Sequence, residues 1–156
     1  MKETLSLAIR AAVSVLLFCG IGEGSFAQEN SLQAGVAAID ITPNYPVRLN
    51  GFGGRRTESE GVTLPIFAKA LAFSDPEQGP AILITVDNLG VSLEIIQEVA
   101  SRLRSKGNVK PERLTITATH THTAPMLKDV SPTVFGVPIP PEHQANIERY
   151  TREFTD

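Results

Sequence analysis

Two short apolar segments, 81–87 (AILITVD) and 113–118 (RLTITA), decide the expected fold of this chain. Each has the length and the β-branched composition of a strand, and the first is a continuous apolar run typical of a central buried strand. Between them, residues 92–106 repeat apolar side chains at the spacing of one helical face, with Ser92 as the expected N-cap. Strand, helix and strand form a βαβ unit, so we predict that the two strands are parallel.

Further elements are expected on either side of this unit. Residues 34–42 and 65–74 have strand patterns, and in the second of these large and small side chains alternate. Gly107 is the expected C-terminal cap of the first helix. Another helix is expected from Glu142 onward, because apolar side chains recur on one side of that segment. The prediction is an α/β fold with a mixed sheet that contains a parallel βαβ unit.

Composition and charge restrict the class of protein. The chain has 156 residues, of which 42% are hydrophobic and 20% are charged. These shares are close to globular averages, so a single folded domain is expected. The net charge is −3 and the basic residues form no long stripe. A nucleic-acid partner or an anionic membrane recruited by bulk charge is therefore excluded, whereas the oligomeric state stays open.

Residues 1–27 have the layout of a secretory signal peptide. Lys2 and Arg10 give it a positive start, and the apolar stretch 11–21 is shorter than the about 20 residues that a membrane-spanning helix needs. The mature chain, residues 28–156, is therefore expected to be secreted or periplasmic and to have no integral membrane span. An N-terminal anchor that is never cut is the alternative, and attachment to a membrane surface stays open.

The only cysteine, Cys19, falls within this expected signal peptide. The mature chain would then have no disulfide. Any transition-metal site in it would have to use imidazole, carboxylate or phenolate ligands in place of thiolate.

The candidate chemistry is concentrated in residues 119–122 (THTH), directly after the second strand of the βαβ unit. In an extended segment, residues two apart point to the same side, so His120 and His122 are expected to face one cavity. Neutral imidazole suits zinc, and this pattern favours a metal-dependent hydrolytic site. The alternative is that both histidines lie in a polar turn. The third histidine, His143, is interpreted as a solvated residue of the final helix.

Four other residues are candidates for the same site. Asp87 and Asn88 leave the carboxyl end of the first parallel strand, where open α/β sheets bind ligands, and are predicted to orient a metal ligand. The alternative is that Asp87 caps a loop backbone. Arg55 and Arg56 lie in the glycine-rich segment 47–63 and are predicted to bind a substrate oxyanion or carboxylate, unless this segment is a mobile surface loop. The apolar residues of 123–141 either line an acyl-chain entrance or pack against further parts of the domain.

Five motifs occur in a fixed order along the chain. They are 34–43 (AGVAAIDITP), 50–53 (NGFG), 67–71 (FAKAL), 84–87 (ITVD) and 119–125 (THTHTAP). The ordered set resembles the N-terminal part of the neutral/alkaline (non-lysosomal) ceramidase family, and the resemblance covers essentially all of the expected mature chain. It implies a zinc-dependent amidohydrolase, in which a metal-activated water cleaves the amide of N-acylsphingosine or of a related N-acyl lipid.

The resemblance also implies roles for the two histidines. His120 matches the first zinc-ligating histidine of the family. His122 matches the second histidine of the motif, which lies beside the metal and assists the water or the developing oxyanion. The family's remaining ligands are a histidine, a glutamate and a tyrosine, and they are expected beyond residue 156. The chain is therefore expected to be the N-terminal part of a larger catalytic domain.

Two departures from the family pattern leave the substrate open. Thr63 stands where ceramidases usually carry a histidine, and residues 124–127 (APML) stand where they usually carry Gly-Pro-Gly-Gly. Two alternatives to a ceramidase-like enzyme therefore remain. One is a catalytically incomplete fragment or binding module on the same scaffold, and the other is a hydrolase of small esters or amides.

Overall fold

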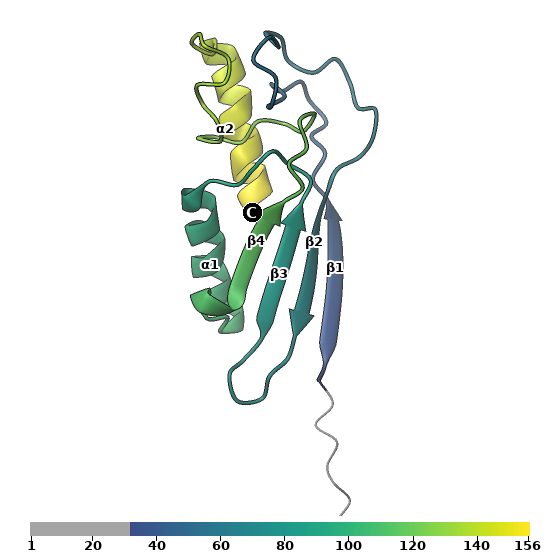
Figure 1. Cartoon of the computed structure of the whole chain (residues 1–156), viewed down its shortest axis with the longest axis vertical. Helices are drawn as coiled ribbons and strands as arrows, with labels where there is room; N and C mark the ends of the chain where they lie inside the picture. Colours follow the sequence, from purple (N-terminus) through teal and green to yellow (C-terminus); the bar gives the residue numbers. More distant parts are fainter. Residues whose placement is uncertain (1–31) are drawn as a thin grey trace, which may run out of the picture. The chain divides into compact units, whose positions relative to one another are not determined.

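A single mixed sheet organises the chain in a computed structural model that describes residues 32–156 (Figure 1). The expected signal peptide and Cys19 lie outside the described residues. The strands are β1 (Ala34–Asp40), β2 (Phe67–Phe73), β3 (Ala81–Val86) and β4 (Leu114–Ala118), in the spatial order β1-β2-β3-β4. β1 and β3 are antiparallel to β2, whereas β3 and β4 are parallel. The predicted α/β fold with a parallel βαβ unit is confirmed.

The helix of the βαβ unit is α1 (Leu93–Gly107). Its predicted N-cap is confirmed, because the hydroxyl of Ser92 accepts a hydrogen bond from the amide of Ile95 at 3.4 Å. The predicted C-cap is wrong. Gly107 is the last helical residue, and Asn108 adopts the left-handed conformation (φ 51°) that ends the helix. Asparagine tolerates a positive φ better than most residues, so it can replace glycine at this position.

A 3₁₀ turn, η1 (Pro111–Arg113), follows α1 and leads into β4. The last element is α2 (Pro141–Thr155). His143 of α2 is half-buried and not solvated as expected. Its Nδ1 atom lies 3.3 Å from Nη1 of Arg48, and since a guanidinium only donates, Nδ1 accepts. Among residues 32–156, neither helix has the length and apolar character required to cross a bilayer.

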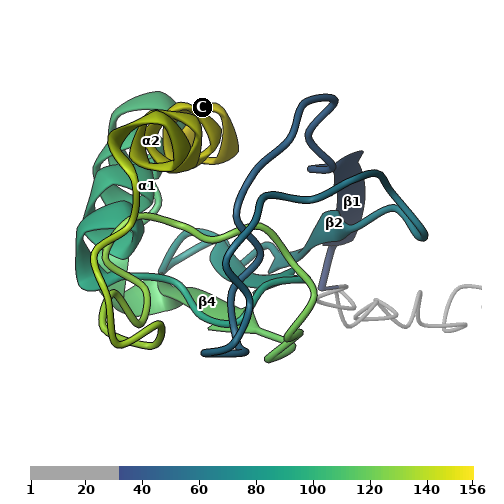
Figure 2. The same cartoon turned by 90° about the horizontal axis from the view of Figure 1, so that it is seen from above.

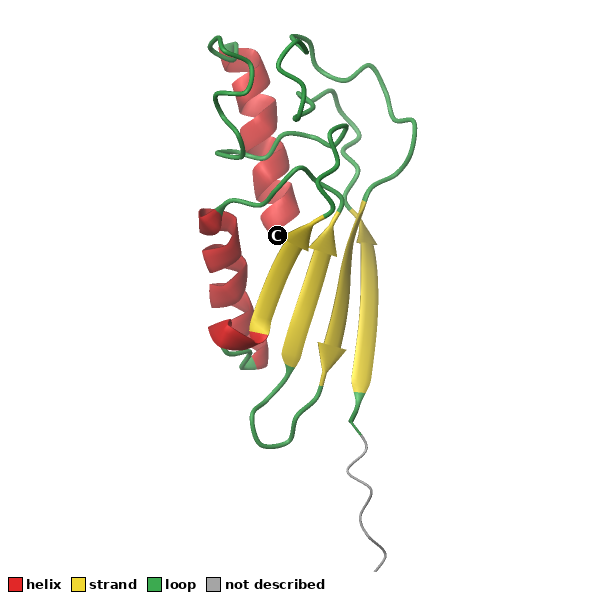
Figure 3. Cartoon of the chain, in the orientation of Figure 1, coloured by secondary structure: helices red, strands yellow, loops and turns green. Residues whose placement is uncertain are grey.

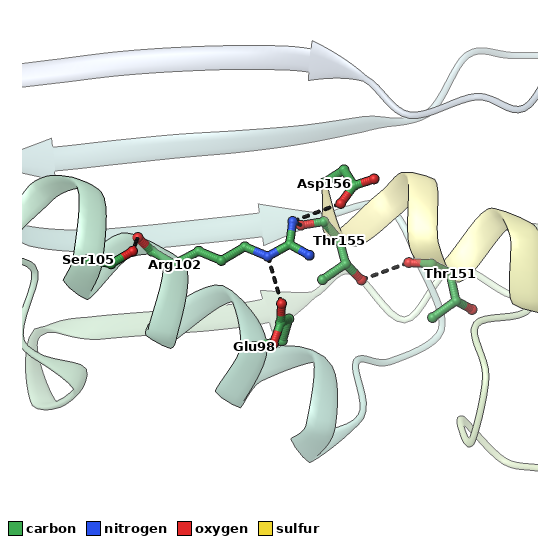
Figure 4. A network of polar contacts seen from close by, with 6 residues as sticks. All are labelled: Glu98, Arg102, Ser105, Thr151, Thr155 and Asp156. Carbon is green, nitrogen blue, oxygen red and sulfur yellow. Dashed lines mark hydrogen bonds and ion pairs between the residues drawn. The ribbon is translucent and has the colours of Figure 1, made fainter.

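Both helices lie toward the β4 side of the sheet and contact each other, as Figures 1 and 2 show. The contact includes a network around Arg102 of α1 (Figure 4). Its Nε atom bonds Glu98 at 2.8 Å, and Nη1 bonds the carboxylate of Asp156 at 2.8 Å and the carbonyl of Thr155 at 3.1 Å. These groups are largely exposed, so the network orients the helix ends without contributing much stability. At the opposite edge, β1 is exposed along its whole length.

The main hydrophobic core lies between α2 and the irregular segment 123–141. Its buried side chains come from loops and helices more than from strands: Val47, Leu89, Ile95, Met126, Leu127, Val130, Phe135, Ile147 and Tyr150. Met126, Leu127 and Phe135 are at most 2% exposed. These three residues therefore neither line an acyl-chain entrance nor wait for further parts of the domain, because they pack in a core with α2 of this chain. Apolar burial here explains how a proline-rich segment without regular structure is held in place.

Candidate functional site

The candidate site lies where the loops gather at the end of the sheet to which β1, β3 and β4 point (Figure 3). Loop 47–50 runs beside 124–126. The amide of Asn50 donates to the carbonyl of Ala124 at 3.0 Å, and the amide of Met126 donates to the carbonyl of Arg48 at 2.7 Å. The glycine-rich loop is thereby brought against the Thr-His-Thr-His segment. The expected placement of the site at the carboxyl ends of the parallel strands is consistent with this arrangement.

His120 is held by a hydrogen bond of its ring. Its Nδ1 atom lies 2.9 Å from the carbonyl oxygen of Leu89, in the loop that follows β3. A carbonyl oxygen only accepts, so Nδ1 carries the proton and the lone pair of the neutral ring is on Nε2. The backbone of the next residue is also fixed, because the amide of Thr121 donates to the carbonyl of Asn88 at 3.0 Å.

The backbone around His120 differs from the expectation. His120 has a φ of 61°, so the segment is a turn and not extended, and the argument that residues two apart point to one side does not apply. The two rings nevertheless meet. The ring centroids of His120 and His122 lie 4.8 Å apart, with the planes inclined by 71°. The left-handed turn, and not strand alternation, brings the two imidazoles together.

Gly51 and Phe52 form the wall behind His122. A Cβ atom at Gly51 would lie 2.6 Å from Cγ of His122, and Gly51 has a φ of 94°. Only glycine therefore suits this position, on grounds of both space and backbone conformation. The ring of Phe52 stands edge-on to that of His122, with centroids 5.2 Å apart. The loop thus limits where the imidazole of His122 can lie.

The two arginines of the loop make different contacts. Nη1 of Arg55 donates to the carbonyl of His122 at 2.9 Å and to that of Asn50 at 3.2 Å. Nη1 of Arg56 donates to the carbonyl of Phe135, at 2.5 Å. Arg55 therefore adjoins the histidine pair, whereas Arg56 contacts the segment that follows it. Substrate binding by these residues stays a prediction.

Asp87 lies at the end of β3 but contacts neither ring. The amide of Phe67 donates to its Oδ2 at 3.0 Å, and the hydroxyl of Thr119 donates to its Oδ1 at 3.4 Å. The Thr119 hydroxyl in turn lies 2.7 Å from that of Thr121. Within the part of the chain that the structure describes, the partner of the His120 ring is the carbonyl of Leu89. Orientation of a metal ligand by Asp87 stays a prediction, and so does the loop cap, because the amide that Asp87 accepts belongs to the first residue of β2.

Two buried asparagines organise the loops around the histidines, and sequence reasoning did not single out Asn50. Asn50 and Asn88 are both 0% exposed. The Asn88 side-chain amide donates to the carbonyl of Pro125 at 3.0 Å, and that of Asn50 to Val130 at 2.8 Å. Each side-chain oxygen also accepts the amide of the next residue in the chain. Turn residues beside an asparagine predict such loop-bridging hydrogen bonds only weakly, because asparagine is common in turns of every kind.

A groove of about 710 Å³ opens beside this segment. It is lined by parts of two loops, 42–49 and 59–66, together with Asp87, Thr121, Thr123 and Pro125. Thr63, one of the two departures from the ceramidase pattern, is in this lining. The groove borders the His-x-His segment through Thr121 and Thr123, and neither histidine side chain is part of its lining.

The histidine pair fits a metal in its donor chemistry. The Nε2 lone pair of His120 is of the kind that ligates zinc, and the hydrogen bond on Nδ1 is the usual way to orient such a ring. Among residues 32–156, no group of three or more histidine, cysteine, aspartate or glutamate side chains gathers in a metal-binding arrangement. If zinc binds, the described residues would supply at most two imidazoles of the three or four ligands that it takes.

Comparison with known proteins gives a likeness in structure. The chain is similar to a crystal structure of neutral ceramidase from Pseudomonas aeruginosa, with a TM-score of 0.55 and 21% sequence identity. The match covers 61% of this chain and 16% of that chain. The fold resembles one part of a neutral ceramidase. A structure of a ceramidase complexed with C2 matches equally, with a TM-score of 0.55, 21% identity, and coverage of 61% and 15%.

The likeness to the ceramidases concerns the fold, and this chain spans about one sixth of their length. No protein-family model matches the sequence, and no curated protein matches it in a sequence search. The sequence resemblance drawn from five ordered motifs and the similarity in fold point to the same family of structures.

Proposed function

We propose that this chain contributes the histidine-bearing part of a zinc-dependent amidohydrolase that acts on an N-acyl lipid. The observation that carries the proposal is the geometry of His120, whose ring is oriented by Leu89 and stands next to that of His122. The order of the five motifs and the similarity in fold to neutral ceramidase support it.

The two imidazoles would have separate roles. His120 would bind zinc through Nε2, because its Nδ1 proton is engaged by Leu89. His122 would hold or transfer a proton beside the metal, and would donate to the oxyanion that forms on the amide carbonyl. Zinc, when bound, supplies Lewis acidity that lowers the pKa of water and polarises the carbonyl. The remaining ligands would come from residues other than 32–156.

We infer the substrate class from the groove and from the two departures from the ceramidase sequence pattern, at Thr63 and at residues 124–127. A groove with both apolar and hydroxyl groups suits a substrate that has a hydrocarbon part and an amide. Thr63 lines this groove where ceramidases usually carry a histidine, so the head group accepted here would differ from that of ceramide. A related N-acyl lipid is therefore our preferred substrate, with Arg55 or Arg56 as candidates to bind a carboxylate or an oxyanion. Export through the signal peptide over 1–27 remains part of the proposal.

The proposal is tested on the full-length gene product, with zinc content and amide hydrolysis as two separate measurements. We expect about one zinc per chain, and we expect His120→Ala to lose both the metal and the activity. His143→Gln is the matched control for zinc content, because glutamine keeps an acceptor for Arg48 and the residue lies on α2. A His120→Ala protein that keeps both zinc and activity would remove the core of the proposal.

A catalytically incomplete binding module is the second candidate. It is favoured by one observation, namely that residues 32–156 contain no cluster of three possible metal ligands. The DNA that follows codon 156 separates the two candidates. An open continuation that encodes a further histidine, glutamate and tyrosine supports the enzyme, whereas a stop codon supports the module.

The third candidate, a hydrolase of small esters or amides, differs only in substrate. Ceramide and short-chain N-acyl amides would be offered to the same full-length protein. A higher kcat/KM on the short-chain compounds would favour this candidate over the lipid amidohydrolase.

A further inference from the structure

Arg48 is a charged side chain in an unusual environment. Only 2% of its surface is exposed, and within residues 32–156 no carboxylate forms a salt bridge with it. Its guanidinium lies 4.1 Å from the centroid of the Phe135 ring. Glu58 interacts with this charge only at longer range, and a buried cation without a salt-bridge partner is costly, so its environment must supply other partners.

Backbone carbonyls are those partners. Nη1 of Arg48 donates to the carbonyl of Arg56 at 2.8 Å, and Nη2 donates to the carbonyl of Arg55 at 2.7 Å. Nη1 also lies 3.3 Å from Nδ1 of His143. The planar fork of arginine spans two successive carbonyls, which a lysine ammonium cannot do with the same geometry. Arg48 therefore fixes the direction of the peptide groups at the end of loop 50–56.

The end of the loop that Arg48 holds also contacts His122. The side chain of Arg55, at this end, donates to the carbonyls of Asn50 and His122. The start of the loop places Gly51 against the His122 ring, where no Cβ atom would fit. Both ends of the loop thus contact His122, and Arg48 holds one of them from the buried side.

We propose that Arg48 is a positioning residue, which holds loop 50–56 in the shape that packs Gly51 and Arg55 against His122. Its effect on catalysis rests on the proposed function, because it acts only through His122. His120 is held independently, by the carbonyl of Leu89 and by the turn at Asn88 and Thr121. Loss of Arg48 should therefore displace one imidazole and leave the other in place.

The imidazole signals of His120 and His122 make the proposal measurable. In full-length protein with isotope-labelled histidine, a long-range proton–nitrogen correlation spectrum reports on each imidazole, with signals assigned from single histidine variants. Arg48→Met keeps the apolar stem and removes every donor. We expect the His122 signals to shift or broaden in this variant and the His120 signals to move less, through the ring contact with His122 alone. Signals that are unchanged for both rings, or that move equally for both, would overturn the proposal.

Arg102→Met is the matched control. It makes the same chemical change at a guanidinium that joins α1 to the end of α2 and contacts no residue of loop 50–56 (Figure 4). We expect it to leave both His120 and His122 signals unchanged. If Arg48→Met does not fold, Arg48→Lys replaces it, since lysine keeps the charge but not the fork. A folded Arg48→Lys protein with an unshifted His122 would equally refute the positioning role.

Activity gives an independent readout. Where the full-length protein hydrolyses an N-acyl substrate, Arg48→Met should lower kcat by roughly 10- to 100-fold, the scale expected for a displaced catalytic group, with a smaller change in KM. A protein without hydrolytic activity would contradict the proposed function only. The histidine spectrum would still decide whether Arg48 positions His122.

Discussion

The Nδ1 atom of His120 lies 2.9 Å from the carbonyl oxygen of Leu89, and this contact fixes which nitrogen of the ring is available to a ligand. The two residues leave neighbouring parallel strands, β4 and β3, whose ends meet at one edge of the sheet. The βαβ topology therefore both brings the histidine to the site and supplies the acceptor that sets its tautomer.

The tautomer of His120 is the first prediction. In metal-free protein at a pH where the ring is neutral, His120 should carry its proton on Nδ1, because Leu89 offers only an acceptor. The nitrogen shifts of the imidazole distinguish the two tautomers. A neutral His120 with its proton on Nε2 would show that the Leu89 contact does not exist in solution.

Gly51→Ala should be destabilising and should displace His122. The new Cβ atom would lie 2.6 Å from Cγ of His122, and alanine would have to adopt a φ of 94°. We expect a loss of roughly 1 to 3 kcal/mol in the free energy of unfolding. Gly54→Ala is the control, because its Cβ atom would meet no atom within 4 Å and its φ is not positive. Equal losses from the two variants, measured by denaturant unfolding, would count against the close approach.

Ile147→Ala tests whether α2 belongs to the core. Ile147 is 1% exposed and lies among Met126, Leu127 and Phe135 in the core cluster. Truncation should cost about 2–5 kcal/mol, because it removes buried methyl groups and leaves a cavity. Leu93→Ala, at an α1 position that is 63% exposed, should change the stability by less than about 0.5 kcal/mol. A small effect at Ile147 would mean that α2 does not pack as the structure describes.

The two tyrosines should resist ionisation until the protein unfolds in alkali. Burial, together with a hydrogen bond to Glu153, raises the pKa of Tyr45 from 10.0 to about 12. Burial likewise raises the pKa of Tyr150 far above its usual value. Because both pKa values are higher in the folded state, their contribution to stability is complete below pH 10 and is lost as the pH rises toward 12 and beyond.

Absorbance of the tyrosinate during an alkaline titration checks this prediction, with circular dichroism recorded on the same samples. Ionisation should coincide with loss of structure. Tyr45→Phe removes one of the two groups and should leave Tyr150 to ionise with the remaining unfolding transition. Two tyrosines that ionise near pH 10 in folded protein would contradict the burial of Tyr150 and the contact of Tyr45 with Glu153.

The parts of the fold that were predictable depend on local patterns. The run 81–87, the helical repeat after Ser92 and the alternation of 65–74 record strand and helix periods directly, so β2, β3 and α1 were expected within two residues of their observed ends. The C-cap was misplaced by one residue, because glycine and asparagine both satisfy a left-handed position and the helical pattern does not choose between them.

The site was predictable only as a motif. Its composition and its place after a strand indicate His120 and His122, but the extended backbone that predicts their proximity is absent at His120. A single residue with a φ of 61° does not change the periodicity of the sequence. A glycine at position 120 would indicate a left-handed backbone, whereas a histidine does so only weakly. The acceptor for His120 is a main-chain carbonyl, which every residue possesses, so no residue type could have pointed to Leu89.

The sequence by itself determined the βαβ unit, the mixed sheet and the chemistry carried by the Thr-His-Thr-His segment, because each depends on neighbours along the chain. The tertiary structure alone decided that loop 50–56 backs His122, that Arg48 holds this loop, and that the apolar residues of 123–141 form the core with α2. These contacts join loops and helices distant in sequence, and packing and backbone hydrogen bonds between such segments follow no period that can be read along the chain.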